Sequence, residues 1–116
     1  KLRNAISEIY KAGINPFLWG IVTPKNEEDN KKLSDTLNQF DQEVGIIFQG
    51  ETISIEHIEH FFKLTNNSIY NCGFKVGSNL FWEYWGKFIH GKIEKSEISK
   101  KITKKSQKLI NIYIKK

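Results

Sequence analysis

The sequence contains no methionine, one cysteine, two prolines and a single arginine among 116 residues. Cys72 has no second cysteine with which to form a disulfide, so we expect an intracellular protein of the cytoplasm or nucleus. Because translation starts with methionine, its absence indicates a processed product or a piece of a longer chain. No apolar run approaches the roughly 20 residues of a membrane-spanning helix, so no membrane partner is expected.

Motifs of catalytic and cofactor sites are equally scarce. The glycines at 45, 50, 73 and 77 do not have the spacing of a phosphate-binding loop, and we expect no cofactor. Glu56 and His60 lie four residues apart, as metal ligands sometimes do, but a third ligand would have to come from His90 or Cys72. A solvated, ion-paired helix face explains the same residues. We therefore expect no metal site or catalytic residue, and the sequence argues against an enzyme without excluding one.

Length and periodicity predict one α+β domain, helix-rich, with a two- or three-stranded sheet and a basic C-terminal helix. In this interpretation residues 1–91 are the globular part and residues 92–116 are a basic amphipathic segment of the same domain. The expected helices are 2–12, a segment capped by Asn26, 55–63, a short one through Ile69 and Cys72, and 80–89; the expected strands are 17–22 and 44–48.

The aromatic residues are concentrated in the last of these globular helices. Phe81, Trp82, Tyr84, Trp85 and Phe88 all fall within eight residues. Aromatic side chains supply much of the buried area of a small domain, so we expect this helix at the centre of the core. Stacking of a tryptophan on a base or ligand is the alternative.

The positive charge lies at the carboxyl end. Residues 91–116 contain nine lysines and two glutamates, a net +7, so the other ninety residues carry −2 of the total +5. At 100° per residue, apolar residues between 98 and 113 share one helix face. The opposite arc holds five lysines, namely Lys100, Lys101, Lys104, Lys105 and Lys108. Such a row suits a phosphate backbone, although a solvated surface, or less plausibly a helix lying on lipid, explains it too. The alternating isoleucines from Ile110 to Ile114 predict that the helix gives way to a terminal strand.

The segment IEHIEHFFKLTNNSIYNC, residues 55–72, carries a second signal. With Leu64 at the turn, Ile58, Phe62, Ile69 and Cys72 occupy the inward positions of two crossing helices. The segment, within residues 53–73, thus resembles helix-turn-helix and winged-helix DNA-binding domains, although Glu59 stands where that family usually has alanine. The resemblance implies an exposed recognition helix carrying Asn66, Asn67, Ser68, Tyr70 and Asn71.

These patterns together predict a nucleic-acid-binding module. The lysine row would supply affinity and residues 66–71 would supply positioning, with DNA preferred to RNA as the partner. Because arginine is the usual reader of guanine and the chain has only Arg3, sequence selectivity should be weak. The alternative is a protein-interaction module, or a subunit of a larger assembly, in which the lysines contact an acidic protein surface.

Overall fold

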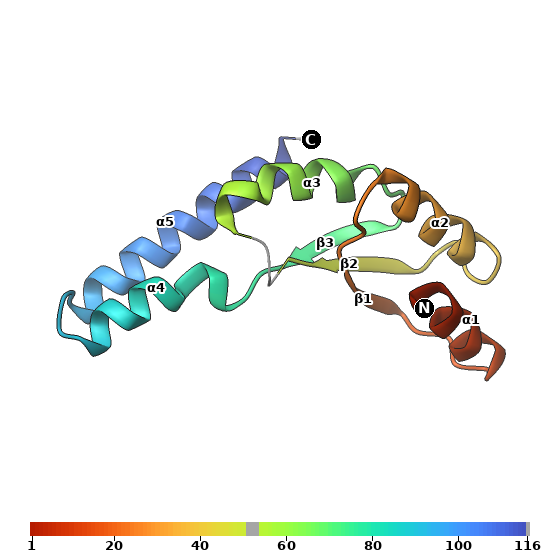
Figure 1. The fold of residues 1–116 in the computed structure, drawn as a ribbon, viewed down its shortest axis with the longest axis horizontal. Helices are drawn as coiled ribbons and strands as arrows, with labels where there is room; N and C mark the ends of the chain where they lie inside the picture. Colours follow the sequence, from red (N-terminus) through yellow and green to blue (C-terminus); the bar gives the residue numbers. More distant parts are fainter. Residues whose placement is uncertain (51–53, 116) are drawn as a thin grey trace. The chain divides into compact units, whose positions relative to one another are not determined.

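The computed structural model describes residues 1–50 and 54–115 of the chain. Its elements alternate between helix and strand along most of the sequence (Figure 1). In chain order they are α1 (Leu2–Lys11), β1 (Leu18–Val22), α2 (Glu27–Asn38), β2 (Gly45–Gln49), the 3-10 turn η1 (Ile55–His57), α3 (Ile58–Asn66), β3 (Asn71–Lys75), α4 (Ser78–Ile89) and α5 (Lys95–Ile114). The α+β fold with a three-stranded sheet and a C-terminal helix is therefore confirmed.

The chain divides into two compact units. The first comprises residues 1–49 and 64–74, and the second comprises residues 50–63 and 75–116. Helices α4 and α5 pack against each other within the second unit.

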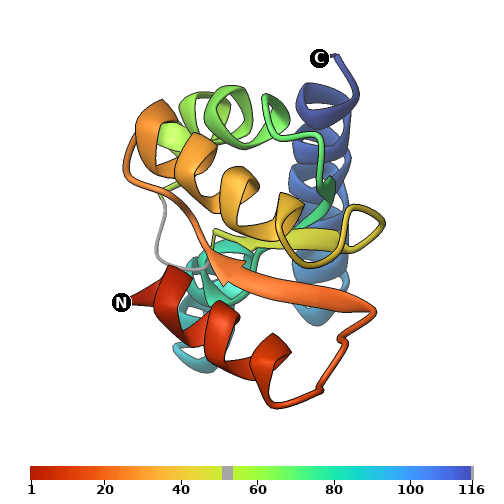
Figure 2. The same cartoon turned by 90° about the vertical axis from the view of Figure 1, so that its right-hand side faces the viewer.

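The first unit is built on the sheet, whose order is β1-β2-β3. β1 and β2 run parallel, with Leu18 opposite Gly45 and Val22 opposite Gln49. Helix α2 connects these two strands and packs on one face of the sheet (Figures 1 and 2). Asn26 caps α2 as predicted, since its side chain accepts a hydrogen bond from the Asp29 amide at 2.8 Å.

The core of the first unit lies between the sheet and its helices. Parallel strands in this position bury alternate side chains, and in β2 the side chains of Ile46 and Phe48 are fully buried. The remaining buried apolar residues of this unit come from α1, α2, β1, the end of α3 and the residues just before β2 and β3: Ile6, Tyr10, Ile21, Leu33, Leu37, Val44, Leu64 and Tyr70. Leu18 and Val22, on the alternate positions of β1, are 43% and 66% exposed, so the second face of β1 is largely uncovered.

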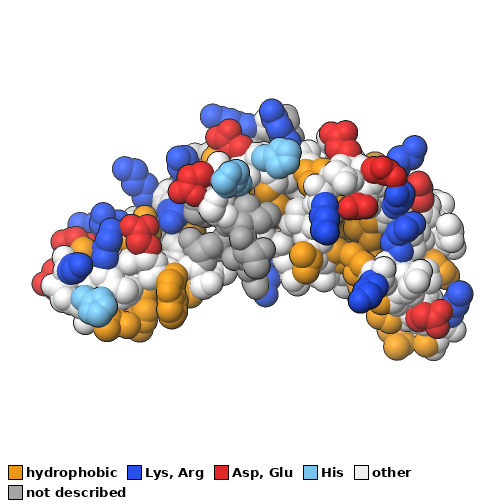
Figure 3. Space-filling view, in the orientation of Figure 1, with side chains coloured by type: hydrophobic (Ala, Val, Ile, Leu, Met, Phe, Trp, Pro, Cys, Tyr) orange, Lys and Arg blue, Asp and Glu red, His pale blue; other side chains and the backbone are white. Residues whose placement is uncertain are grey.

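In the second unit α4 and α5 form a helical hairpin, and Gly91 turns the chain between them with φ of +67°. Only glycine adopts this left-handed conformation without strain. The expectation that α4 is the centre of the core is wrong. Phe81, Trp82 and Trp85 are 39%, 66% and 46% exposed, and apolar side chains gather on the outer side of α4 (Figure 3).

Two further expectations about local structure are wrong. Residues 71–75 form strand β3, so the short helix through Cys72 does not exist. The isoleucines at the end of the chain continue α5 as far as Ile114 instead of forming a strand. In both places a contact with a distant segment decides the conformation: β3 pairs with β2, and Tyr113 packs edge-on against Phe62 at 5.3 Å. The sequence also offers Thr52 or Ser54 as the cap of the helix expected at 55–63, and Thr52 lies outside the described residues.

Candidate functional site

Helix α5 presents its apolar residues on one side and its lysines on the other, as the periodicity predicts. Leu109 is buried, and Ile98, Ile102 and Tyr113 are partly buried. The helix contains six lysines and one glutamate, a net charge of 6 − 1 = +5. A 20-residue helix of this composition depends on packing of its apolar stripe, because the like charges repel one another.

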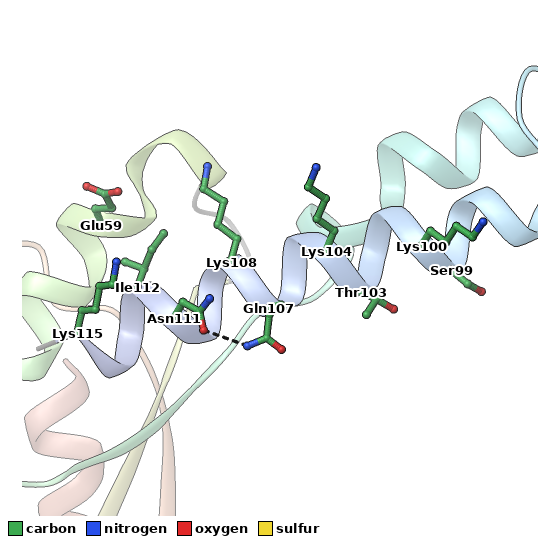
Figure 4. A pocket seen from close by; sticks show the side chains of 10 residues that line it. All are labelled: Glu59, Ser99, Lys100, Thr103, Lys104, Gln107, Lys108, Asn111, Ile112 and Lys115. Atoms are coloured by element: carbon green, nitrogen blue, oxygen red, sulfur yellow. Dashed lines mark hydrogen bonds between the residues drawn. The ribbon is translucent and has the colours of Figure 1, made fainter.

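The lysines fall into two rows rather than one. Lys100, Lys104 and Lys108, each four residues from the next, lie along an open groove of about 840 Å³. Figure 4 shows their side chains projecting from the same stretch of α5. The groove is further lined by Lys115, Glu59 of α3, and a polar stripe: Ser99, Thr103, Gln107 and Asn111, with Ile112 as the apolar member. We call this set the lysine groove.

The second row faces helix α4. The Nζ atoms of Lys101 and Lys105 lie 5.8 and 5.2 Å from the centroid of the Tyr84 ring. The Nζ atom of Lys87 lies 6.0 Å from the same centroid. Lys87 donates a hydrogen bond to Glu83 at 2.8 Å. That bond and the charge of Lys87 lower the pKa of Glu83, with smaller contributions from Lys105 and Lys101. The charge of this row is therefore partly balanced by a tyrosine face and a carboxylate.

The lysines of the groove lack such compensation. Within residues 1–50 and 54–115 the ion pairs involve Lys11, Lys32 and Lys87, and none includes Lys100, Lys104 or Lys108. All three are exposed. Among residues 1–50 and 54–115, Glu59 is the one carboxylate that lines the groove, and it too is exposed. The arrangement can bind an extended anion that contacts several ammonium groups at once.

The residues predicted for a recognition helix instead span the last residue of α3, the turn that follows it and the first residue of β3. Ser68 and Tyr70 are buried, at 7% and 3% exposure, and so cannot lie on an exposed reading face. The Tyr70 hydroxyl donates a short hydrogen bond to Asn38 Oδ1, and the Ser68 hydroxyl accepts from the Tyr70 amide at 3.3 Å. These side chains hold the turn in place.

The three asparagines of this turn are also engaged. Asn71 Nδ2 donates to Asn66 Oδ1 at 2.7 Å, while Asn71 Oδ1 accepts from the Gly73 amide at 3.1 Å. Asn67 is exposed, and its side-chain nitrogen Nδ2 donates a hydrogen bond to Glu27 Oε1 at 3.4 Å. An asparagine that reads adenine needs both its donor and its acceptor, so Asn66 and Asn71 are unsuited to that task in this conformation.

Of the five inward positions of the expected helix-turn-helix, three are buried and two are exposed. Ile58, Phe62 and Leu64 are buried in or next to α3. Ile69 is 82% exposed, and Cys72 is exposed on β3 with its thiol donating to the Ile46 carbonyl at 3.3 Å. The first helix of the motif is therefore present and the second is replaced by a strand.

The histidine-containing segment of η1 and the start of α3 shows local hydrogen bonding at its η1 end. Ser54 Oγ and His57 Nδ1 are 2.6 Å apart, and hydrogen bonds from its own backbone amide and from Ser54 lower the pKa of Glu56. The part of the chain that the structure describes contains no group of three or more His, Cys, Asp or Glu side chains placed to hold a metal ion. The paired Glu56 and His60 thus have no third ligand among these residues.

Residues that the sequence interpretation missed also line the groove. Thr103, Gln107, Asn111 and Lys115 follow one another at a spacing of four residues, so helical periodicity extended to Lys115, the residue after α5, would have found them. Glu59 could not have been found in this way, because its place beside α5 depends on packing between α3 and α5.

The comparisons with known proteins give a family and no function. Among the described residues no helix is long and apolar enough to cross a membrane. No curated protein and no solved structure matches the chain significantly. The model of one protein family, described as "Uncharacterized protein conserved in bacteria (DUF2090)", matches residues 1–116, so the chain belongs to that family.

Proposed function

We propose that the lysine groove of α5 binds a nucleic acid through its phosphate backbone. The observation that supports this most is the row of Lys100, Lys104 and Lys108, exposed and without an ion pair in the described part of the chain. Consecutive members are separated by roughly 6 Å along the helix axis. Several phosphates of one strand can therefore be neutralised together, and release of their counterions drives binding.

The proposed interaction has little sequence selectivity. Ser99, Thr103 and Gln107 run beside the lysines and can donate hydrogen bonds to phosphate oxygens, which position a nucleic acid without identifying its bases. The asparagines at 66 and 71 are withdrawn from base recognition by their own hydrogen bonds. The proposal therefore depends on α5 alone and needs no helix-turn-helix.

The test is a salt titration of binding to a generic DNA duplex of about 20 base pairs, followed by fluorescence anisotropy. Replacing Lys100, Lys104 and Lys108 together by Gln should lower the slope of log K against log salt concentration by about three, one for each lost phosphate contact. The control replaces Lys11, Lys31 and Lys92, which are exposed and outside the groove, and should leave the slope unchanged. Absence of binding by the unmodified protein at 50 mM salt would refute the proposal.

A subunit of a larger assembly is the second candidate, and a separate observation favours it. The outer side of α4 exposes Trp82 and Ile89 at 66% and 62%, together with Phe81 and Trp85. Exposed apolar patches of this kind are typical of protein contact surfaces. Parallel sheets are usually covered on both faces, whereas the face of β1 that carries Leu18 and Val22 is largely open. Sedimentation velocity that shows association, together with no duplex binding at low salt, would favour this candidate.

We propose the bacterial cytoplasm as the compartment. The family is described as conserved in bacteria, which removes the reason to consider a nucleus. The free thiol of Cys72 is exposed, a state that a reducing compartment preserves. Fractionation of a bacterial cell that expresses the protein, probed with an antibody, would test this.

A further inference from the structure

A second cavity lies in the first unit, at the carboxyl end of strand β1. It has a volume of about 460 Å³ and is enclosed by the first residues of α1, the loop that follows β1, and the first turns of α2. Cavities of 300–1,000 Å³ are the usual size of small-molecule sites. Ligands of parallel α/β sheets bind outside the carboxyl ends of the strands, so the position as well as the size indicates a ligand site.

Positive charge dominates the lining of this cavity. The side chains of Lys1, Arg3 and Lys25 contribute three cations, against one carboxylate from Asp29. None of these four side chains forms an ion pair within residues 1–50 and 54–115. The lysines that are paired in these ranges, Lys11, Lys32 and Lys87, do not line the cavity. Like charges that line one cavity repel one another, and a bound anion relieves that repulsion.

The local structure explains why these cations line the same cavity. The loop from Thr23 to Lys25 follows directly after strand β1, which ends at Val22. The Thr23 hydroxyl holds this loop against β2 by donating a hydrogen bond to the Gln49 carbonyl at 3.0 Å. The Asn26 cap then starts α2 immediately after Lys25. The fully buried Leu33 forms an apolar wall. The lining thus includes cations as well as apolar residues.

From this arrangement we propose that the cavity binds a small phosphate monoester. The net charge of the lining, 3 − 1 = +2, complements a phosphate group, which carries about −1.5 to −2 at neutral pH. The guanidinium of Arg3 can donate two parallel hydrogen bonds to phosphate oxygens, and the two ammonium groups complete the charge balance. The apolar wall accommodates the organic part of the ligand. This proposal is independent of the lysine groove, which belongs to α5.

The experiment titrates ¹⁵N-labelled protein with inorganic phosphate at constant ionic strength and follows the backbone amides by NMR. Saturable shifts are expected at Arg3, Thr23 and Lys25. The Arg3→Gln and Lys25→Gln variants should each weaken binding by about tenfold, which corresponds to the loss of one charge-assisted hydrogen bond. Lys31→Gln, an exposed lysine of α2 outside the cavity, is the matched control and should bind phosphate as the unmodified protein does.

Two further measurements make the outcome decisive. Acetate, which carries a single charge, is titrated in the same way. If the site is specific for phosphate, acetate should saturate it only at about tenfold higher concentration. The Lys100, Lys104 and Lys108 variant should retain phosphate binding at the cavity whether or not it binds DNA. The proposal would be overturned by shifts that do not saturate or that spread over all lysines. It would also be overturned if Lys31→Gln weakened phosphate binding as much as Arg3→Gln and Lys25→Gln do.

Discussion

At the residue scale, Tyr70 shows how a side chain predicted to contact a ligand instead stabilises the fold. Its ring is 3% exposed and its hydroxyl donates to Asn38 Oδ1, which connects β3 to the end of α2. The sequence motif placed Tyr70 on a helix surface. The same residue in a turn is drawn inward because its aromatic ring gains more from burial than from exposure.

The Tyr70→Phe variant should lose about 1 kcal/mol of unfolding free energy at neutral pH, because Asn38 loses its donor. Burial, followed by the charges of Asp41 and Tyr10, raises the pKa of Tyr70 in the folded protein. Stability should therefore be complete below the pKa of an unfolded tyrosine, about 10, and decline as pH rises through the folded pKa.

Urea unfolding at pH 8 and pH 10.5 measures both effects. The unmodified protein should lose more stability between these two pH values than Tyr70→Phe does, because the variant has no phenol at this position. An identical loss in both proteins would show that Tyr70 does not carry the alkaline sensitivity.

At the element scale, two glycines that the sequence does not distinguish have opposite roles. A Cβ at Gly45 of β2 would lie 2.7 Å from Leu18 Cδ2 and 2.8 Å from Cys72 Sγ, so these side chains of β1 and β3 would have to shift to admit a methyl group. A Cβ at Gly86, inside α4, would meet no atom within 4 Å. Gly45 is therefore needed for packing, whereas Gly86 only weakens its helix.

We expect Gly45→Ala to cost about 1–3 kcal/mol of stability through overpacking, and Gly86→Ala to increase stability by up to about 1 kcal/mol. Thermal unfolding of the two variants beside the unmodified protein provides the measurement, with each serving as control for the other. Destabilisation by both would mean that α4 is packed more tightly around Gly86 than the structure indicates.

The elements also show what the sequence can and cannot predict. Helices α1, α2 and α4 and strands β1 and β2 were predicted because the apolar pattern lies within each segment, and α2 has in addition a cap and acidic residues in its first turn. β3 was missed because NCGFK has weak periodicity and becomes a strand only by pairing with β2. The lysine row of α5 was likewise predictable from spacing, whereas the engagement of Asn67 by Glu27, forty residues away, was not.

At the scale of the whole molecule, the distribution of charge is more informative than its total. The net charge is +5 over 116 residues, a modest excess, yet α5 alone carries +5 and the rest of the chain is close to neutral. A uniformly basic protein would attract polyanions from every side. Here the attraction should depend on where a charge lies, because fields from exposed groups fade within about 8–10 Å at physiological salt.

Two variants of identical net charge test this dependence. Changing Lys100, Lys104 and Lys108 to Glu alters the net charge by −6, from +5 to −1, and so does changing Lys11, Lys31 and Lys92 to Glu. If α5 is the polyanion surface, the first variant should lose duplex binding at about 100 mM salt, while the second retains most of it. Circular dichroism of both variants confirms that each remains folded. Equal losses would show that net charge, and not the lysine groove, governs binding, since the two variants carry the same net charge.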